Sequence, residues 1–215
     1  MYDYSKKSTQ DGEITHLGVW HQAVLKLHAF DDQSVLDIGC GSGSFLQAVA
    51  PKAQKVLGVD PNPHNIAALR EHNIPGLLGY LEDNEENCQG YTIITCFEVI
   101  EHLYSPTELF RTIYNLLPPG GQVIVTTPNA FHLLRTLRFA VNQEHHDPLL
   151  DPSRTETPEH IRLWSSRMLS RSLTQAGFTH VQSYGVAHLF GSMRIFKSRL
   201  LVERLSQHLI SIATK

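Results

Sequence analysis

Residues 35–45, VLDIGCGSGSF, place three alternate glycines directly after a short apolar run. The apolar run is typical of a strand that is buried on both faces. Gly39, Gly41 and Gly43 allow backbone conformations that other residues rarely adopt, and they let a ligand approach the main chain. A helix after the glycines would present its N-terminus to the same space. The segment therefore predicts a strand, a ligand-binding loop and a helix in succession.

The rest of the chain repeats this order of strand and helix. Asn62 can cap the helix after the second strand, and Pro63 suits its first turn. Strict alternation predicts an α/β fold with a doubly wound, mostly parallel sheet and a ligand beyond the carboxyl ends of the strands. The predicted helices are 15–29, 63–72, 106–117, 165–176 and a basic helix near 192–206. The apolar runs predict seven strands, at 34–38, 55–60, 76–81, 91–97, 121–127, 178–186 and 208–214.

The composition limits the class of protein. The chain has 215 residues, of which 41% are hydrophobic, so it can form one sizeable core, and we expect a single domain over 1–215. With 18 basic and 21 acidic residues, the net charge of −3 gives no general attraction to nucleic acid. Three scattered cysteines favour reduced thiols, and no apolar run approaches the roughly 20 residues of a membrane-spanning helix. We expect a cytoplasmic protein without a nucleic-acid partner.

Two acidic residues near the glycines indicate which cofactor is bound. Asp60 ends the second strand, where a carboxylate can accept hydrogen bonds from ribose hydroxyls. Asp37 precedes the loop and would repel the pyrophosphate of a nicotinamide dinucleotide, whose motif would be Gly-x-Gly-x-x-Gly. It would suit a ligand with an amino group and a sulfonium, and S-adenosylmethionine has both. A methyl donor is therefore favoured over the cofactor of an oxidoreductase.

Five segments in order resemble the class I S-adenosylmethionine-dependent methyltransferases. They are VLDIGCGSGSF, VLGVDPNP, CFEVIEHL, LLPPGGQVIVTTPN and HIRLWSSRMLSRSLTQAGF. The resemblance covers roughly 30–215 and implies a Rossmann-like seven-stranded sheet whose last strand is antiparallel. It also implies that Tyr80 and Leu81 flank the adenine, and that Cys96 and Phe97 lie near the methyl group, although Cys96 is also explained as a small buried hydrophobe. The cofactor-binding residues that it implies are Asp37, Gly39, Cys40, Gly41, Asp60, Pro61, Tyr80, Leu81, Cys96 and Phe97.

The segment EVIEH follows the fourth strand and carries candidate catalytic residues. If it is helical, Glu98, Glu101 and His102 share one face beside the methyl group. The pattern is similar to that of the ubiquinone-pathway O-methyltransferases and of the methyltransferases of small-RNA 3′ ends, and the resemblance adds His160. These four residues would form a divalent-metal site for manganese, iron or zinc. Alternatively, the carboxylates orient a metal-free acceptor and one histidine is the general base.

Residues 128–164 are expected to form a substrate-side insertion or lid. They include a predicted helix with His132, Arg135 and Arg138 beside leucines, which could meet an anionic or lipid-linked acceptor, although a helix packed on the sheet explains it as well. Residues 194–205 could make a peripheral membrane contact, although a packed crossover helix explains them as well. The function expected is O-methylation of a small-molecule, sugar or quinone-precursor hydroxyl. The alternative is an S-adenosylmethionine-binding partner or regulatory protein without catalysis.

Overall fold

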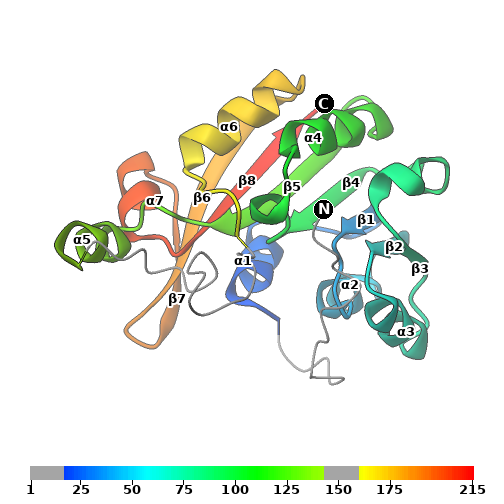
Figure 1. Cartoon of the computed structure of the whole chain (residues 1–215). Coiled ribbons are helices and arrows are strands. Elements are labelled where there is room, and N and C mark those ends of the chain that lie inside the picture. The colour runs from blue at the N-terminus through cyan, green and yellow to red at the C-terminus, as the bar shows by residue number, and fades with distance from the viewer. Residues whose placement is uncertain (1–16, 143–159) are drawn as a thin grey trace.

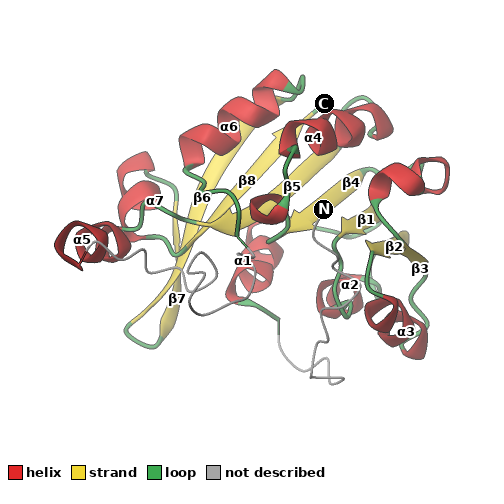
Figure 2. Cartoon of the chain, viewed as in Figure 1, coloured by secondary structure: helices red, strands yellow, loops and turns green. Residues whose placement is uncertain are grey.

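The computed structural model describes residues 17–142 and 160–215, which form one twisted sheet with helices on both faces (Figure 1). The strands are β1 (Ser34–Ile38), β2 (Lys55–Asp60), β3 (Gly76–Leu78), β4 (Ile93–Phe97), β5 (Gln122–Pro128), β6 (Thr179–Leu189), β7 (Ser192–Phe196) and β8 (His208–Thr214). The helices are α1 (Val19–Leu27), α2 (Ser44–Val49), α3 (Pro63–Glu71), α4 (Pro106–Leu116), α5 (Leu133–Asn142), α6 (Ser166–Gln175) and α7 (Arg199–Leu205). The α/β alternation predicted from the sequence is confirmed (Figure 2).

The strand order is β3-β2-β1-β4-β5-β8-β6-β7. The pairs among β1 to β5 are parallel, whereas β8 is antiparallel to both of its neighbours, β5 and β6. The first six strands therefore run in one direction, while β7 and β8 run in the other. An antiparallel strand begins where its parallel neighbours end, so the first residue of β8 lies at the carboxyl edge of the sheet.

The predicted number of strands and the predicted basic helix need correction. In the described part of the chain the sheet has eight strands, because residues 192–196 form β7 and the helix covers only Arg199–Leu205. Phe190 and Gly191 both have positive φ, of 50° and 75°, and together they form the two-residue connection between β6 and β7. Such a turn matches the twist of paired strands and directs the chain back along β6. The basic residues near 192–206 gave no sign of this hairpin.

The helices cover the sheet in two layers. Side chains of α1, α2 and α3 pack in one apolar cluster, and those of α4, α6 and α7 pack in another, on the opposite face. The predicted cap is present, because Asn62 Oδ1 accepts a hydrogen bond of 2.9 Å from His64 N at the start of α3. This two-layer packing leaves the carboxyl edge of the sheet uncovered by the regular helices, and the loops there form the site.

Part of the predicted insertion lies outside the described residues, so its role as a lid stays a prediction. Its helix α5 contacts α7 rather than lying against the sheet. Leu134, Leu137 and Val141 of α5 are exposed, and contact of this helix with an anionic or lipid-linked acceptor stays a prediction, as does peripheral membrane contact of residues 194–205. Among the described helices, none is long and apolar enough to cross a bilayer.

Candidate cofactor pocket and acidic-histidine cluster

The glycine loop passes directly under the chain that follows β4. Gly39 has φ +68°, and a Cβ atom there would lie 2.4 Å from Val99 Cγ2. Gly39 N donates a hydrogen bond of 2.8 Å to Val59 O, which holds the loop against β2. Gly41 has φ +54°, and a Cβ atom there would meet nothing within 4 Å. The loop therefore needs glycine at 39 for close packing as well as for its backbone conformation.

Asp60 ties the loop to the start of α3. Its Oδ2 accepts a hydrogen bond of 2.9 Å from Gly41 N, and its Oδ1 accepts bonds from Asn62 N at 2.8 Å and Asn65 Nδ2 at 3.0 Å. A carboxylate has about four lone-pair positions, so these three bonds leave Oδ2 able to accept another. That remaining capacity is what a ribose hydroxyl requires.

A pocket opens between this loop and the ends of β2 and β4. Of the residues predicted to bind the cofactor, Gly39, Asp60, Pro61, Tyr80 and Leu81 line it. The neighbours Asn62, Asn65 and Val99 also line the pocket and were not predicted from the sequence. Asn62 and Asn65 were detectable in part, because they lie at the N-cap and in the first turn of the helix that follows Asp60. The pocket thus lies at the carboxyl ends of β2 and β4, where an α/β sheet binds its ligand.

Five other residues predicted to bind the cofactor do not line this pocket. Of the described residues, those that line the pocket do not include Asp37, Cys40, Gly41, Cys96 or Phe97. Phe97 packs against Phe45, with ring centroids 4.7 Å apart. Burial raises the pKa of the Cys96 thiol well above its ordinary value, and its side chain is fully buried. Cys96 thus has the surroundings of a small buried hydrophobe.

Asp37 is a buried carboxyl beneath the loop, 1% exposed. Its Oδ1 accepts a hydrogen bond of 2.6 Å from Thr95 Oγ1. Burial raises the pKa of Asp37 to about 7, the bond from Thr95 opposes the rise, and the charge of Asp60 adds to it. A nearby positive charge would favour the ionised form of such a carboxyl.

The second feature is a cluster of Glu101, His102 and His160. Each offers one ligand atom, and these atoms lie within 4.8 Å of one another. The rings of His102 and His160 are 4.8 Å apart between centroids, and Thr127 Oγ1 donates a hydrogen bond of 3.0 Å to Glu101 Oε2. A mixed set of carboxylate and imidazole donors at this separation fits a divalent transition metal.

Residues 160–162 reach the cluster because they pair with the turn after β4. The backbone N–H groups of Ile161 and Arg162 both donate to Glu101 O, at 3.0 and 3.1 Å. Arg162 Nε also donates a hydrogen bond of 2.9 Å to Leu103 O. These bonds fix the segment that carries His160 beside Glu101, although 59 residues separate them in sequence.

The prediction that Glu98 shares a helical face with Glu101 and His102 is wrong. The chain turns at Glu98, which has φ +54°, and only Ile100–His102 form a short 3₁₀ turn, η4. Glu98 lines the cofactor pocket instead, as does His102, whereas Glu101 and His160 border a smaller neighbouring cavity. His102 thus joins the cofactor pocket to the cluster.

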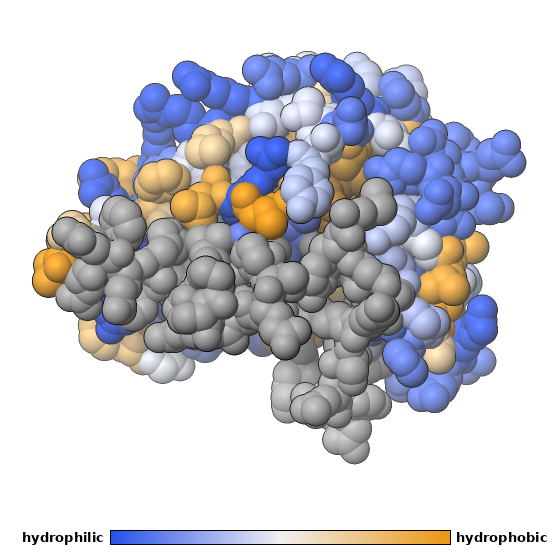
Figure 3. Space-filling view, viewed as in Figure 1, coloured by the Kyte–Doolittle hydropathy of each residue, from blue (hydrophilic) through white to orange (hydrophobic). Residues whose placement is uncertain are grey.

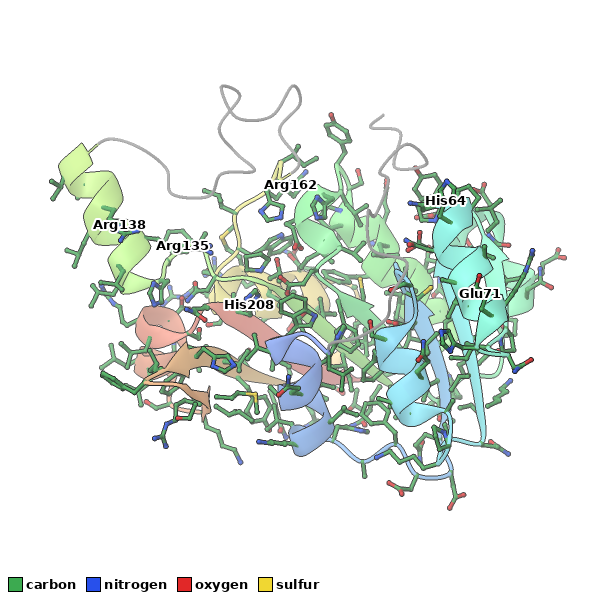
Figure 4. The ribbon with its side chains drawn as sticks, turned by 90° about the horizontal axis from the view of Figure 1, so that it is seen from below. His64, Glu71, Arg135, Arg138, Arg162 and His208 are labelled. Atoms are coloured by element: carbon green, nitrogen blue, oxygen red, sulfur yellow. The ribbon has the colours of Figure 1, made fainter. Side chains whose placement is uncertain are left out.

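Glu98 has its own partners. Its Oε1 accepts a hydrogen bond of 2.8 Å from Thr126 Oγ1, and its Oε2 lies 2.9 Å from His208 Nδ1. His208 packs against Trp20 of α1, with ring centroids 4.7 Å apart, and Figure 4 shows it near the middle of the molecule. His208 was not predicted from the sequence, since it lies 110 residues from Glu98 and the reversed direction of β8 brings it to this edge.

Comparisons with known proteins agree with this geometry. Residues 15–183 match the family model described as a methyltransferase domain. The ubiquinone biosynthesis O-methyltransferase of Serratia proteamaculans (strain 568) is 31% identical over 105 residues, which are 46% of this chain and 44% of that protein. The chain therefore spans less than half of the length of this curated relative.

Solved structures share the fold. A SAM-dependent methyltransferase from Archaeoglobus fulgidus superposes with a TM-score of 0.67 at 18% identity, covering 92% of this chain and 93% of the other. Phosphoethanolamine N-methyltransferase 2 of Haemonchus contortus, in complex with S-adenosyl-L-methionine, gives a TM-score of 0.61 at 18% identity, covering 91% and 52%. The family model matches most of the chain, and the glycine loop and the acidic strand end agree with it. The chain therefore belongs to the class I S-adenosylmethionine-dependent methyltransferase family.

Proposed function

We propose that this protein transfers the methyl group of S-adenosylmethionine to a hydroxyl of a small molecule, such as a sugar or a quinone precursor. The observation that carries the proposal is the position of His102, which lines the cofactor pocket and belongs to the cluster with Glu101 and His160. An acceptor bound there would lie between the methyl donor and a site that can polarise a hydroxyl. The curated relative named as an O-methyltransferase supports the same class of reaction.

The cofactor would lie along the glycine loop. Gly39 would let it approach the main chain, and Gly41 would be held in place by Asp60. Asp60 would accept a hydrogen bond from the ribose, and Tyr80 and Leu81 would flank the adenine. Asp37 would act from beneath the loop, since a cationic ligand would stabilise its ionised form. Cys40, Pro61, Cys96 and Phe97 would shape this side of the site by packing.

The chemistry that remains for the protein is alignment and proton removal. The sulfonium already activates the methyl carbon, so the new carbon–oxygen bond forms as the carbon–sulfur bond breaks. An aliphatic hydroxyl has a high pKa and requires a base or a cation. Glu98 is the carboxylate on the pocket wall, and it would accept the hydrogen of the acceptor hydroxyl. His208 and Thr126 hold Glu98 for this role.

Glu101, His102 and His160 would hold a divalent cation. The donor set contains both carboxylate and imidazole, which suits manganese, iron or zinc better than magnesium. When bound, the cation would supply Lewis-acid stabilisation of the developing oxyanion. An acceptor with two vicinal oxygens could bind the cation and also present an oxygen to the methyl group.

The test is methyl transfer to defined probes. We would incubate the protein with S-adenosylmethionine and either 3,4-dihydroxybenzoate or 4-hydroxybenzoate, with manganese or with chelator, and measure products by mass spectrometry. We expect methylation of the vicinal dihydroxy probe, dependent on metal and lost in His102→Ala. His64→Ala is the matched control, because His64 is exposed on α3. Binding of S-adenosylhomocysteine with transfer to neither probe would contradict this choice of acceptor.

A further inference from the structure

A second concave surface lies between α6 and α7, over β6. Its lining extends from Ser166 to Gln175, the full length of α6, and reaches Arg199 and Val202 on α7. Ten helical residues span about 15 Å, and the groove has a volume of about 720 Å³. None of its lining residues belongs to the cofactor pocket or to the cluster of Glu101, His102 and His160. It is therefore a separate site.

The rim of this groove is positively charged. Arg167 and Arg171 lie one turn apart on α6, and Lys197 and Arg199 lie on the opposite side. All four residues are exposed, and the lining contains no acidic residue. Within residues 17–142 and 160–215, none of these four side chains forms an ion pair. Figure 3 shows a hydrophilic surface in the region of α6.

Four cations mean more in this chain than they would in a basic protein, and the neighbouring carboxylate of Glu203 accepts a hydrogen bond of 2.5 Å from Ser166 Oγ at one end of the groove. The net charge of the chain is −3, so random placement of its charges would not favour a purely positive groove. Such a groove raises the local concentration of anions and is stabilised when one is bound. Charge complementarity thus indicates an anionic ligand.

The floor of the groove carries a row of hydroxyl groups. Ser170 Oγ of α6 lies 3.1 Å from Ser183 Oγ of β6, and Ser183 Oγ lies 3.4 Å from Ser211 Oγ of β8. Ser211 is fully buried, while Ser170 and Ser183 are partly exposed and line the groove. Ser170 Oγ also donates a hydrogen bond of 2.8 Å to Ser166 O, so Ser183 is the hydroxyl of this row that can turn its hydrogen toward an anion in the groove.

We propose that this groove binds the diphosphate group of a phosphorylated small molecule. Guanidinium groups pair with phosphate oxygens through two parallel hydrogen bonds, and the Ser183 hydroxyl can donate to one of the remaining oxygens. Val181 and Val202 give the groove an apolar portion for the organic part of the ligand. The groove follows α6 for about 15 Å, which exceeds the length of a single phosphate. The proposal does not depend on the acceptor or on catalysis.

The experiment is calorimetric titration of inorganic pyrophosphate into the protein saturated with S-adenosylhomocysteine, which occupies the cofactor pocket. We expect saturable binding of one pyrophosphate per chain. Arg171→Gln and Lys197→Gln should each weaken it by about tenfold, as expected when one charge-assisted contact is lost. Arg70→Gln is the matched control, since Arg70 is an exposed arginine on α3, distant in the fold from the groove.

Folding is checked independently of this site. Each variant should bind S-adenosylhomocysteine with wild-type affinity, which separates loss of the groove from loss of the fold. Absence of saturable pyrophosphate binding would overturn the proposal, as would an equal effect of Arg70→Gln. Tighter binding of a short single-stranded DNA than of pyrophosphate, sensitive to Arg171→Gln, would also overturn it, because the groove would then be a polyanion surface.

Discussion

His208 Nδ1 lies 2.9 Å from Oε2 of Glu98, and this contact joins the start of β8 to the end of β4. Thr126 of β5 donates to the other carboxylate oxygen at 2.8 Å. Three strands thus converge on one carboxylate that lines the cofactor pocket. Because Glu98 also has positive φ, the surrounding contacts hold it in a conformation that a free residue would rarely adopt.

His208→Ala should lower turnover while leaving the affinity for S-adenosylhomocysteine within about twofold, because Glu98 would lose the partner that orients it. A loss of roughly 10²-fold in turnover corresponds to a misplaced acid–base group. His208→Asn, which keeps a nitrogen donor, should recover part of the turnover. His188→Ala is the control, since His188 is exposed on β6. Equal losses at 188 and 208, measured by the mass-spectrometric assay, would count against the positioning role.

Gly39→Ala should abolish cofactor binding, and Gly43→Ala should not. Both glycines have positive φ, and a Cβ atom would lie 2.4 Å from Val99 Cγ2 at the first and 2.3 Å from Leu69 Cδ2 at the second. Both changes therefore destabilise the fold by a similar mechanism, and only Gly39 lines the pocket. Calorimetry with S-adenosylhomocysteine and thermal unfolding separate the two effects. Wild-type affinity in Gly39→Ala would place the cofactor elsewhere.

Asp60→Ala should weaken S-adenosylhomocysteine binding by about 1.5–3 kcal/mol, the range for hydrogen bonds to a charged group. The change removes the acceptor proposed for the ribose and releases Gly41 N from its bond at 2.9 Å. Asp31→Ala is the matched control, because Asp31 is an exposed residue that contacts Lys52 at 3.8 Å. If the two variants bind with the same affinity in calorimetry, Asp60 has no role in the pocket.

Removal of a cluster residue should remove metal. We expect about one manganese per chain in the wild type after dialysis, and a large loss in Glu101→Gln and in His160→Ala, since each deletes one donor of the three. Elemental analysis and calorimetry measure this directly, without an acceptor. His64→Ala should retain the metal. Undiminished binding in His160→Ala would exclude that residue as a ligand.

Asp37→Asn should change how stability depends on pH. The pKa of Asp37 is raised from 3.8 to about 7, so the unfolded chain releases this proton at lower pH than the folded chain. The free energy of unfolding of the wild type should therefore fall as pH rises from about 4 to 7, by up to roughly 4 kcal/mol. The asparagine side chain of the variant cannot ionise, so this decrease should be absent. Urea unfolding at several pH values tests the difference, and parallel curves for the two proteins would disprove it.

The sequence by itself determined the order of strands and helices, because apolar runs, a glycine loop and the cap at Asn62 are local signals. It also indicated the loop and strand ends that form the pocket, since Gly39, Asp60 and Tyr80 lie at predicted strand ends. The sequence also placed Glu101 and His102 together, because these two residues are adjacent in the chain. The resemblance to the methyltransferase family added His160, which the structure places beside Glu101 and His102.

Only the tertiary structure decided the remaining features. The hairpin that forms β7 depends on two positive φ angles at Phe190 and Gly191, which a basic sequence pattern does not reveal. The separation of Glu98 from Glu101 depends on a backbone turn at one residue, and the contact with His208 depends on the direction of β8. Side chains far apart in sequence meet only when strands pair in a particular order. Local patterns therefore predict the elements, whereas the pairing of strands determines which side chains form the site.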